Sequence, residues 1–426
     1  MNSCTKKQPN YYLKIETDGR EAIVGRFPIS DTKAQNVNCY HFIYDEKGRL
    51  AKVERLKSGK LSKGSYSGEN IAKVIIEYSD GYEKRIYQNA KGKPVVDARD
   101  IYSIRLKLDE NGHPTSLFNY DNNGDLAEDN LGVAQYMWTL DKDGRREKSI
   151  RINKAGDRIV DSDGNYELRW VYDKKGNIID YSSHGKDGQL LENNDGIAVY
   201  RYKYDNFDNV TEIQYYGTDE QLKSYGKSGI AVVRNEYDER GNIIKTTHLG
   251  LDGQIKETSD EDYAIICNKY DNQGNLIEQK YLGVDEQLKE EKGSGIAIYR
   301  REFDKNGNLI KIIYYGTDEH IKELKTLGVA KIKYEYNEQG DIIRTSYYGA
   351  DEKLKPQTDW NVAIIYNSYD EQGNLTEVKY CDINDKLKER SDIEAAIVRF
   401  EYDNKGDRKK ITYLDKNEKV IYEKQK

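Results

Sequence analysis

The sequence predicts an all-β fold: a repeat solenoid or spiral sheet of about twelve tandem β-hairpin units of about 33 residues, with capping hairpins at both ends. One Tyr-Asp-x-x-Gly-Asn stretch returns at a nearly constant spacing, and the residues around it alternate with the period of two that is typical of strands. No segment shows helical periodicity with caps. Repetition therefore decides the architecture, and the length of 426 residues is no evidence for separate globular domains.

The unit is clearest from Ala231 to Gly250, which is predicted to be one hairpin. Its first strand ends at Tyr237, Asp238 to Asn242 turn the chain, and the return strand begins at Ile243. The residue before the turn aspartate is aromatic in most units and leucine in two. It recurs at Tyr44, Tyr78, Leu108, Leu140, Tyr172, Tyr204, Tyr237, Tyr270, Phe303, Tyr336, Tyr369 and Tyr402.

Two turns punctuate each unit. The Asp-x-x-Gly-Asn stretch fits a type I turn closed by a glycine at positive φ, which introduces a bulge. Its aspartate can accept the backbone N–H two residues on. The return strand ends in Tyr-Tyr-Gly or a variant, a second turn follows, and a short third strand is then expected. This third strand is anchored by Leu222, Ile255, Leu288, Ile321, Leu354 and Leu387, each followed by lysine.

The slots of the first strand indicate which face is buried. A small residue opens it, as Ala231 does, and rings or asparagines stand four and six residues later on the same face. The opposite face carries charged side chains such as Arg234 and Glu236 and is expected to be wet. We therefore divide the chain into a disordered N-terminal spacer (1–10), an N-terminal cap hairpin (11–37), tandem hairpin repeats (38–410) and a C-terminal cap hairpin (411–426).

Composition limits the partners. Charged residues make up 34% of the chain and mean hydropathy is −0.94, but 37 tyrosines supply large rings to bury. The net charge is −7, with both signs interspersed. Nucleic acid and direct attraction to anionic membranes are therefore not expected.

No pattern of reactive residues indicates an enzyme. The five histidines occupy ordinary repeat slots or a turn, and hydrolase, phosphate-binding and zinc motifs are not found. The Asp/Asn clusters at 121–125 and 161–165 lack the spacing of a calcium loop and are interpreted as solvated turns. We predict no catalytic residue, no metal and no cofactor.

The four cysteines show no disulfide or zinc spacing. Cys4, preceded by small and polar residues and followed by a polar spacer, resembles the processed end of a bacterial lipoprotein. This resemblance implies lipidation at Cys4, a membrane contact only through that anchor, and a location at the bacterial cell envelope. A chance cysteine in a disordered N-terminus, and a cytoplasmic protein, is the alternative.

The stretches Tyr202-Lys203-Tyr204-Asp205 and Tyr334-Glu335-Tyr336-Asn337 resemble the YD repeats of the RHS family. The similarity covers about residues 40 to 414. It implies a spiralling sheet of strand–turn–strand units, as found in bacterial surface and toxin-associated proteins. The carboxy-terminal toxin and the autoproteolytic segment of those proteins have no counterpart here.

The paired tyrosines suggest a function. Consecutive strand residues face opposite ways, so one ring of each pair must reach the surface or a second layer. We expect Tyr216, Tyr315 and Tyr348, flanked by Lys223, Lys322 and Lys355, to form a row that binds a protein or glycan. The leading hypothesis is a non-catalytic repeat scaffold with an extended partner; a toxin-associated or hydrolytic enzyme and a structural envelope spacer are the alternatives.

Overall fold

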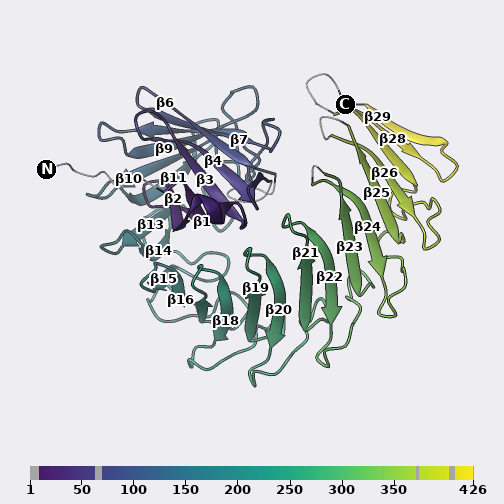
Figure 1. The fold of residues 1–426 in the computed structure, drawn as a ribbon. Coiled ribbons are helices and arrows are strands. Elements are labelled where there is room, and N and C mark those ends of the chain that lie inside the picture. Colours follow the sequence, from purple (N-terminus) through teal and green to yellow (C-terminus); the bar gives the residue numbers. More distant parts are fainter. Residues whose placement is uncertain (1–8, 63–69, 339, 371–373, 403–407, 426) are drawn as a thin grey trace. The chain divides into compact units, whose positions relative to one another are not determined.

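The computed structural model confirms the all-β prediction. It describes residues 9–62, 70–338, 340–370, 374–402 and 408–425, which form β-strands, turns and one four-residue helix. The chain divides into two compact units: Met1–Ser259 with Asn272–Gly274, and Asp260–Asp271 with Asn275–Lys426. Within each unit, neighbouring strands pair antiparallel, and successive hairpins follow one another in chain order (Figure 1).

The first unit contains β1 (Tyr11–Thr17), β2 (Ile23–Ile29), α1 (Asp31–Ala34), β3 (Cys39–Tyr44), β4 (Leu50–Lys57), β5 (Lys60–Leu61), β6 (Lys73–Ser79), β7 (Tyr82–Gln88), β8 (Ser103–Leu108), β9 (Pro114–Tyr120), β10 (Gln135–Leu140), β11 (Arg146–Ile152), β12 (Arg158–Ile159), β13 (Glu167–Tyr172), β14 (Ile178–His184), β15 (Val199–Tyr204), β16 (Val210–Tyr216), β17 (Val232–Tyr237) and β18 (Ile243–Leu249). The second contains β19 (Ile265–Tyr270), β20 (Leu276–Leu282), β21 (Ile298–Phe303), β22 (Leu309–Tyr315), β23 (Lys331–Tyr336), β24 (Ile342–Tyr348), β25 (Ile364–Tyr369), β26 (Leu375–Cys381), β27 (Ile397–Tyr402), β28 (Arg408–Leu414) and β29 (Val420–Gln425). Among the described residues, no helix is long and apolar enough to span a membrane.

The first turn of the unit has the predicted geometry. In the hairpin β17–β18 the register shifts between Glu236 and Tyr237, which is the expected bulge. Asp238 Oδ1 accepts the backbone N–H groups of Arg240 and Asn242, each at 2.9 Å, and Gly241 has φ 72°. The turn therefore satisfies its own backbone through the aspartate, which explains why this residue recurs.

Each unit contributes two long strands, not three. The predicted third strand is reduced in most units to one β-bridge, such as Tyr315 with Ile321. An even number of long strands keeps equivalent slots on the same face in every unit. This arrangement agrees with the recurrence of identical residues at identical positions.

Neighbouring hairpins pair over a shorter length than the strands within one hairpin. Strands β23 and β24 pair at six positions, whereas β22 and β23 pair at only three, from Lys311–Lys333 to Ile313–Lys331. The turn ends of adjacent hairpins are thus not joined by a backbone ladder.

The tyrosine before the turn aspartate makes that missing connection. Tyr336 Oη donates to the carbonyl oxygen of Leu309, the first residue of the preceding return strand, at 2.7 Å. Burial raises the pKa of Tyr336 to about 12, so the hydroxyl stays a donor at physiological pH. The same bond joins Tyr78 to Leu50, Tyr172 to Arg146, Tyr204 to Ile178, Tyr237 to Val210, Tyr369 to Ile342 and Tyr402 to Leu375.

Each unit has its own core, and the small-residue slot is fully enclosed. In the second unit, Ile332, Tyr347 and Val378 belong to one hydrophobic cluster that also includes side chains from the connecting loops. Alanines at the opening of the first strand, such as Ala297 and Ala330, are completely buried. A larger side chain in these slots would have to displace its neighbours.

Candidate functional site

The three tyrosines predicted to leave the core are all half-buried. Tyr216 ends β16, Tyr315 ends β22 and Tyr348 ends β24. The residues before the last two, Tyr314 and Tyr347, are only 4% and 9% exposed and belong to the core cluster. Alternation along the strand therefore separates the two rings of each pair, as expected.

These tyrosines do not form an uninterrupted row. Tyr216 lies in the first unit, whereas Tyr315 and Tyr348 lie in consecutive repeats of the second. The intervening repeats carry Leu249 and Leu282 at the equivalent position. Tyr315 and Tyr348 are thus the pair that the structure places in adjacent repeats.

The predicted lysines connect neighbouring repeats. Lys322 Nζ lies 2.5 Å from Glu290 Oε1, and Lys223 and Lys355 make the same contact at 2.5 Å with Glu192 and Glu323. The stem of Lys322 crosses Gly316, where an added Cβ would come within 3.2 Å of the lysine Cδ. The lysines are therefore engaged in ion pairs between repeats, a role that could not be predicted from the spacing alone.

Other cations lie over the predicted rings. The guanidinium carbon of Arg201 is 4.3 Å from the centre of the Tyr216 ring, and Arg201 Nη2 is 3.3 Å from Glu220 Oε2. The same positions are occupied by Arg300, Tyr315 and Glu319 in one repeat and by Lys331, Tyr348 and Glu352 in the next. We call these three-residue arrangements the cation–ring–acid sets.

The acid of each set has an unfavourable backbone conformation. Glu220 has φ 56° and Glu319 has φ 58°, in the left-handed region that costs a non-glycine residue about 1–2 kcal/mol. Another repeat has Gly253 at the equivalent position, with φ 75°. Because glycine fits this turn without strain, the glutamates point to a role for their side chains.

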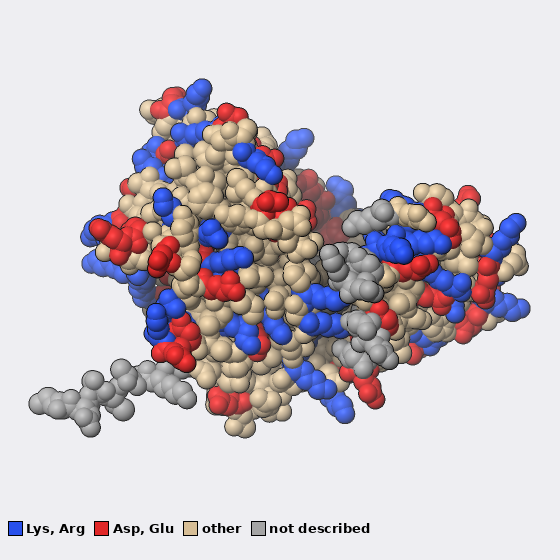
Figure 2. All heavy atoms as spheres, turned by 90° about the horizontal axis from the view of Figure 1, so that it is seen from above, with Lys and Arg blue, Asp and Glu red and all other residues tan. Residues whose placement is uncertain are grey.

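The surface charges alternate in sign. Figure 2 shows Lys and Arg interspersed with Asp and Glu over the face in view. Cross-strand ion pairs contribute to this pattern: Glu212 lies 2.7 Å from Arg234 Nε and 2.6 Å from Lys203 Nζ. The face in view therefore has no large region of one sign.

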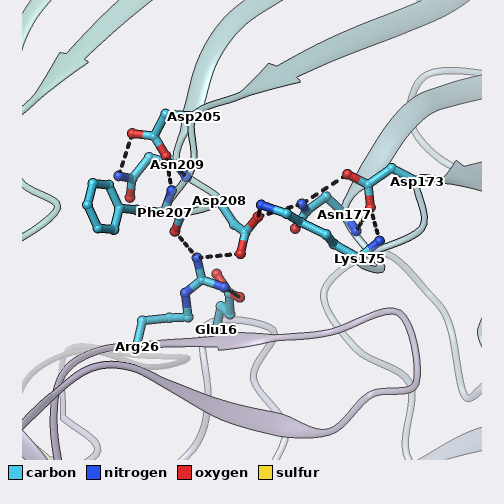
Figure 3. A network of polar contacts seen from close by, with 9 residues as sticks. All are labelled: Glu16, Arg26, Asp173, Lys175, Asn177, Asp205, Phe207, Asp208 and Asn209. Atoms are coloured by element: carbon cyan, nitrogen blue, oxygen red, sulfur yellow. Dashed lines mark hydrogen bonds and ion pairs between the residues drawn. The ribbon is translucent and has the colours of Figure 1, made fainter.

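The N-terminal hairpin β1–β2 contacts the turns of later repeats of the first unit. Figure 3 shows Arg26 of β2 directed at the turn after β15, where it donates to the carbonyl of Phe207 and lies 3.5 Å from Asp208 Oδ2. Lys175 Nζ and Asn177 Nδ2, from the preceding turn, each lie 2.9 Å from Asp208 Oδ1. Asp208 is thus the point at which three segments meet.

Asp208 occupies a glycine position. The next turn of the same type has Gly241 there, and Asp208 adopts the same left-handed conformation with φ 61°. The substitution of aspartate for glycine in a single turn is the sequence signal that could have revealed this contact. Phe27, which lies against Gly241, continues the hairpin's contact into that turn.

A second non-repeating cluster also involves the N-terminal hairpin. Arg146 Nη1 lies 2.5 Å from Glu21 Oε1, and Arg85 Nη2 donates to the carbonyl of Glu21 at 2.5 Å. Arg146 stands where other repeats have apolar residues such as Ile178 and Val210. The sequence analysis missed this cluster, although an arginine in an apolar slot could have indicated it.

No catalytic or metal centre stands out. Within the described ranges, no group of three or more His, Cys, Asp and Glu side chains is placed to hold a metal ion. The buried His184 hydrogen-bonds the carbonyl of Gly188 and the hydroxyl of Ser182, both at 3.0 Å, and burial lowers its pKa. Cys4, the predicted lipidation residue, lies outside the described residues.

Comparisons with known proteins find similarity only among solved structures. No family model and no curated protein matches the sequence. The Photorhabdus luminescens Tc holotoxin pore is 12% identical, with a TM-score of 0.27 over 100% of this chain and 23% of that chain. A TcdB2-TccC3-TEV crystal structure is 11% identical, with a TM-score of 0.25 over 92% of this chain and 22% of that one. The chain thus spans less than a quarter of these proteins, and similarity this low carries no argument about function.

Proposed function

We propose that this protein is a non-catalytic repeat scaffold that binds an extended protein or glycan. The observation that carries the proposal is the recurrence of the cation–ring–acid set, which presents a half-buried tyrosine beside a cation and an exposed carboxylate in several repeats. A partner with a repeating structure can contact several sets, so that weak contacts add to a strong interaction. The strained glutamates support a surface role, because glycine would satisfy the turn alone.

The proposal keeps the relationship to the YD repeats of the RHS family. The Tyr-Asp turn with its bulge, and the tyrosine hydroxyl that ties each hairpin to the one before, support that relationship. A hydrolytic or toxin-associated enzyme is less favoured, because both carboxylates in the non-repeating cluster around Arg85 and Arg146 are engaged by arginines.

Replacing Tyr216, Tyr315 and Tyr348 together with serine is expected to abolish binding while the melting temperature falls only slightly. The rings are half-buried and outside the main core, so their loss leaves that core intact. Binding to glycan and peptide arrays and thermal unfolding would be measured on the same preparation.

A matched control replaces the core partners Tyr314 and Tyr347 with serine. This control is expected to lower the melting temperature strongly, since both rings are buried. Unchanged array binding by the triple variant, or unfolding of the triple variant to the same extent as the control, would refute the proposed surface.

We also propose that the scaffold is held at the bacterial cell envelope through lipidation of Cys4, with a cytoplasmic location as the alternative. The polar spacer after Cys4 supports this proposal, because it separates the anchor from the first strand. In cells that make the complete gene product, Cys4→Ser is expected to move the protein from the membrane fraction to the supernatant. A wild-type protein found only in the supernatant would contradict it.

A further inference from the structure

The first unit contains a cavity of about 250 Å³ that is not repeated along the chain. It lies between the N-terminal hairpin and strands β7 to β11, where the repeat spacing is least regular. Its lining combines charged and aromatic side chains over an apolar floor. The lining residues are Thr17, Glu21, Arg85, Tyr87, Asp97, Arg99, Ile104, Leu117, Tyr136, Trp138 and Arg146.

The charges that line the cavity are already balanced. Asp97, whose side chain is 1% exposed, accepts from Arg99 at 2.9 and 3.1 Å. Arg146 pairs with Glu21. Arg85, with a side chain 4% exposed, has its Nε 2.6 Å from Glu83 Oε1. A ligand that brings a net charge would therefore disturb existing pairs, which disfavours ions and favours a neutral molecule.

The polar capacity that is left over is donor capacity. The indole Nε1 of Trp138 and the Nε of Arg146 are buried and have no hydrogen-bond partner. Both are N–H donors, and a buried donor without an acceptor costs about 1–3 kcal/mol. An acceptor in the cavity would remove this cost, so the missing partner carries oxygen acceptors.

The aromatic side chains limit the shape of such a molecule. Trp138, Tyr136 and Tyr87 present flat rings to the cavity, and Arg146 lies over Trp138, with its guanidinium carbon 5.2 Å from the ring centre. Flat apolar faces beside planar polar groups suit a ring that has C–H groups on its faces and oxygens around its edge. A sugar ring of about twelve non-hydrogen atoms fits the volume.

We propose that this cavity binds a neutral sugar ring, whose hydroxyl or acetamido oxygens accept hydrogen bonds from Trp138 Nε1 and Arg146 Nε. The site is separate from the cation–ring–acid sets and does not depend on them. A single sugar of this size is expected to bind with a dissociation constant of about 1 mM, because small ligands gain limited energy per atom.

The experiment titrates the full chain with methyl glucoside, methyl galactoside, N-acetylglucosamine and glucuronate, followed by calorimetry and ligand-observed NMR. At least one neutral sugar is expected to bind, and glucuronate is expected to bind more weakly because its charge disturbs the balanced pairs. Trp138→Phe, which keeps an aromatic ring but removes the donor, is expected to weaken binding about threefold to tenfold.

Trp360→Phe is the matched control, because Trp360 lies in the second unit and stacks on Arg390 at 3.9 Å. Its binding is expected to equal that of the wild type, and the melting temperature of both variants is recorded to show that they are folded. Failure of every neutral sugar to bind at 20-fold above the expected constant, which is about 20 mM, means a cavity filled only by water and overturns the proposal. Equal binding by wild type and a folded Trp138→Phe variant also overturns it.

Discussion

Replacing Tyr336 with alanine is expected to lower the free energy of unfolding of the second unit by about 3–5 kcal/mol. The ring lies at the turn end of the hairpin, where the backbone ladder to the preceding hairpin has already stopped. The substitution removes both the ring and the hydroxyl that donates to Leu309. Urea unfolding and hydrogen exchange measure the loss, which should be largest in β22, β23 and β24 because repeats contact mainly their neighbours.

Tyr336→Phe separates the hydroxyl from the ring. It should cost about 1–2 kcal/mol, because the carbonyl of Leu309 loses its donor while the apolar contacts remain. Phe303 offers the reciprocal change: Phe303→Tyr places a hydroxyl at the equivalent position and is expected to be neutral or stabilising. A Phe variant as unstable as the Ala variant, or a uniform loss of protection throughout the chain, would contradict the proposed tie between repeats.

Replacing Asp208 with glycine is expected to release the N-terminal hairpin. The carboxylate that joins Arg26, Lys175 and Asn177 disappears, while the turn itself loses its left-handed strain. Losing these charge-assisted contacts should make the amides of β1 and β2 exchange about tenfold to a hundredfold faster. Hydrogen exchange of the intact protein measures this directly.

Glu319→Gly is the control for the backbone part of that change. Glu319 has a similar φ, but its side chain is 55% exposed and pairs only weakly with Arg300, at 3.5 Å. This variant should stabilise the second unit by about 0.5–1 kcal/mol, because glycine relieves the strain. If Asp208→Gly leaves the exchange of β1 and β2 unchanged, Asp208 does not hold the hairpin.

The repeat, its hairpins, its bulged turn and the separation of the paired tyrosines could all be predicted from the sequence. These features depend on residues close in the chain: Asp238 bonds to Arg240 and Asn242 in its own turn, and alternation alone puts Tyr314 and Tyr315 on opposite faces. The third strand was overestimated, because one apolar residue per unit, such as Ile321, is enough for a bridge but not for a ladder.

Only the tertiary structure decided how the repeats hold together and where they depart from regularity. The bond from Tyr336 to Leu309 and the pair of Lys322 with Glu290 each cross from one repeat to the one before. Arg26 reaches Phe207 across 181 positions of sequence. Such contacts depend on how far each hairpin advances from the last and on where the N-terminal hairpin docks. Local periodicity carries no information on either, so the Asp208 contact and the polar cavity appear only when the chain is folded.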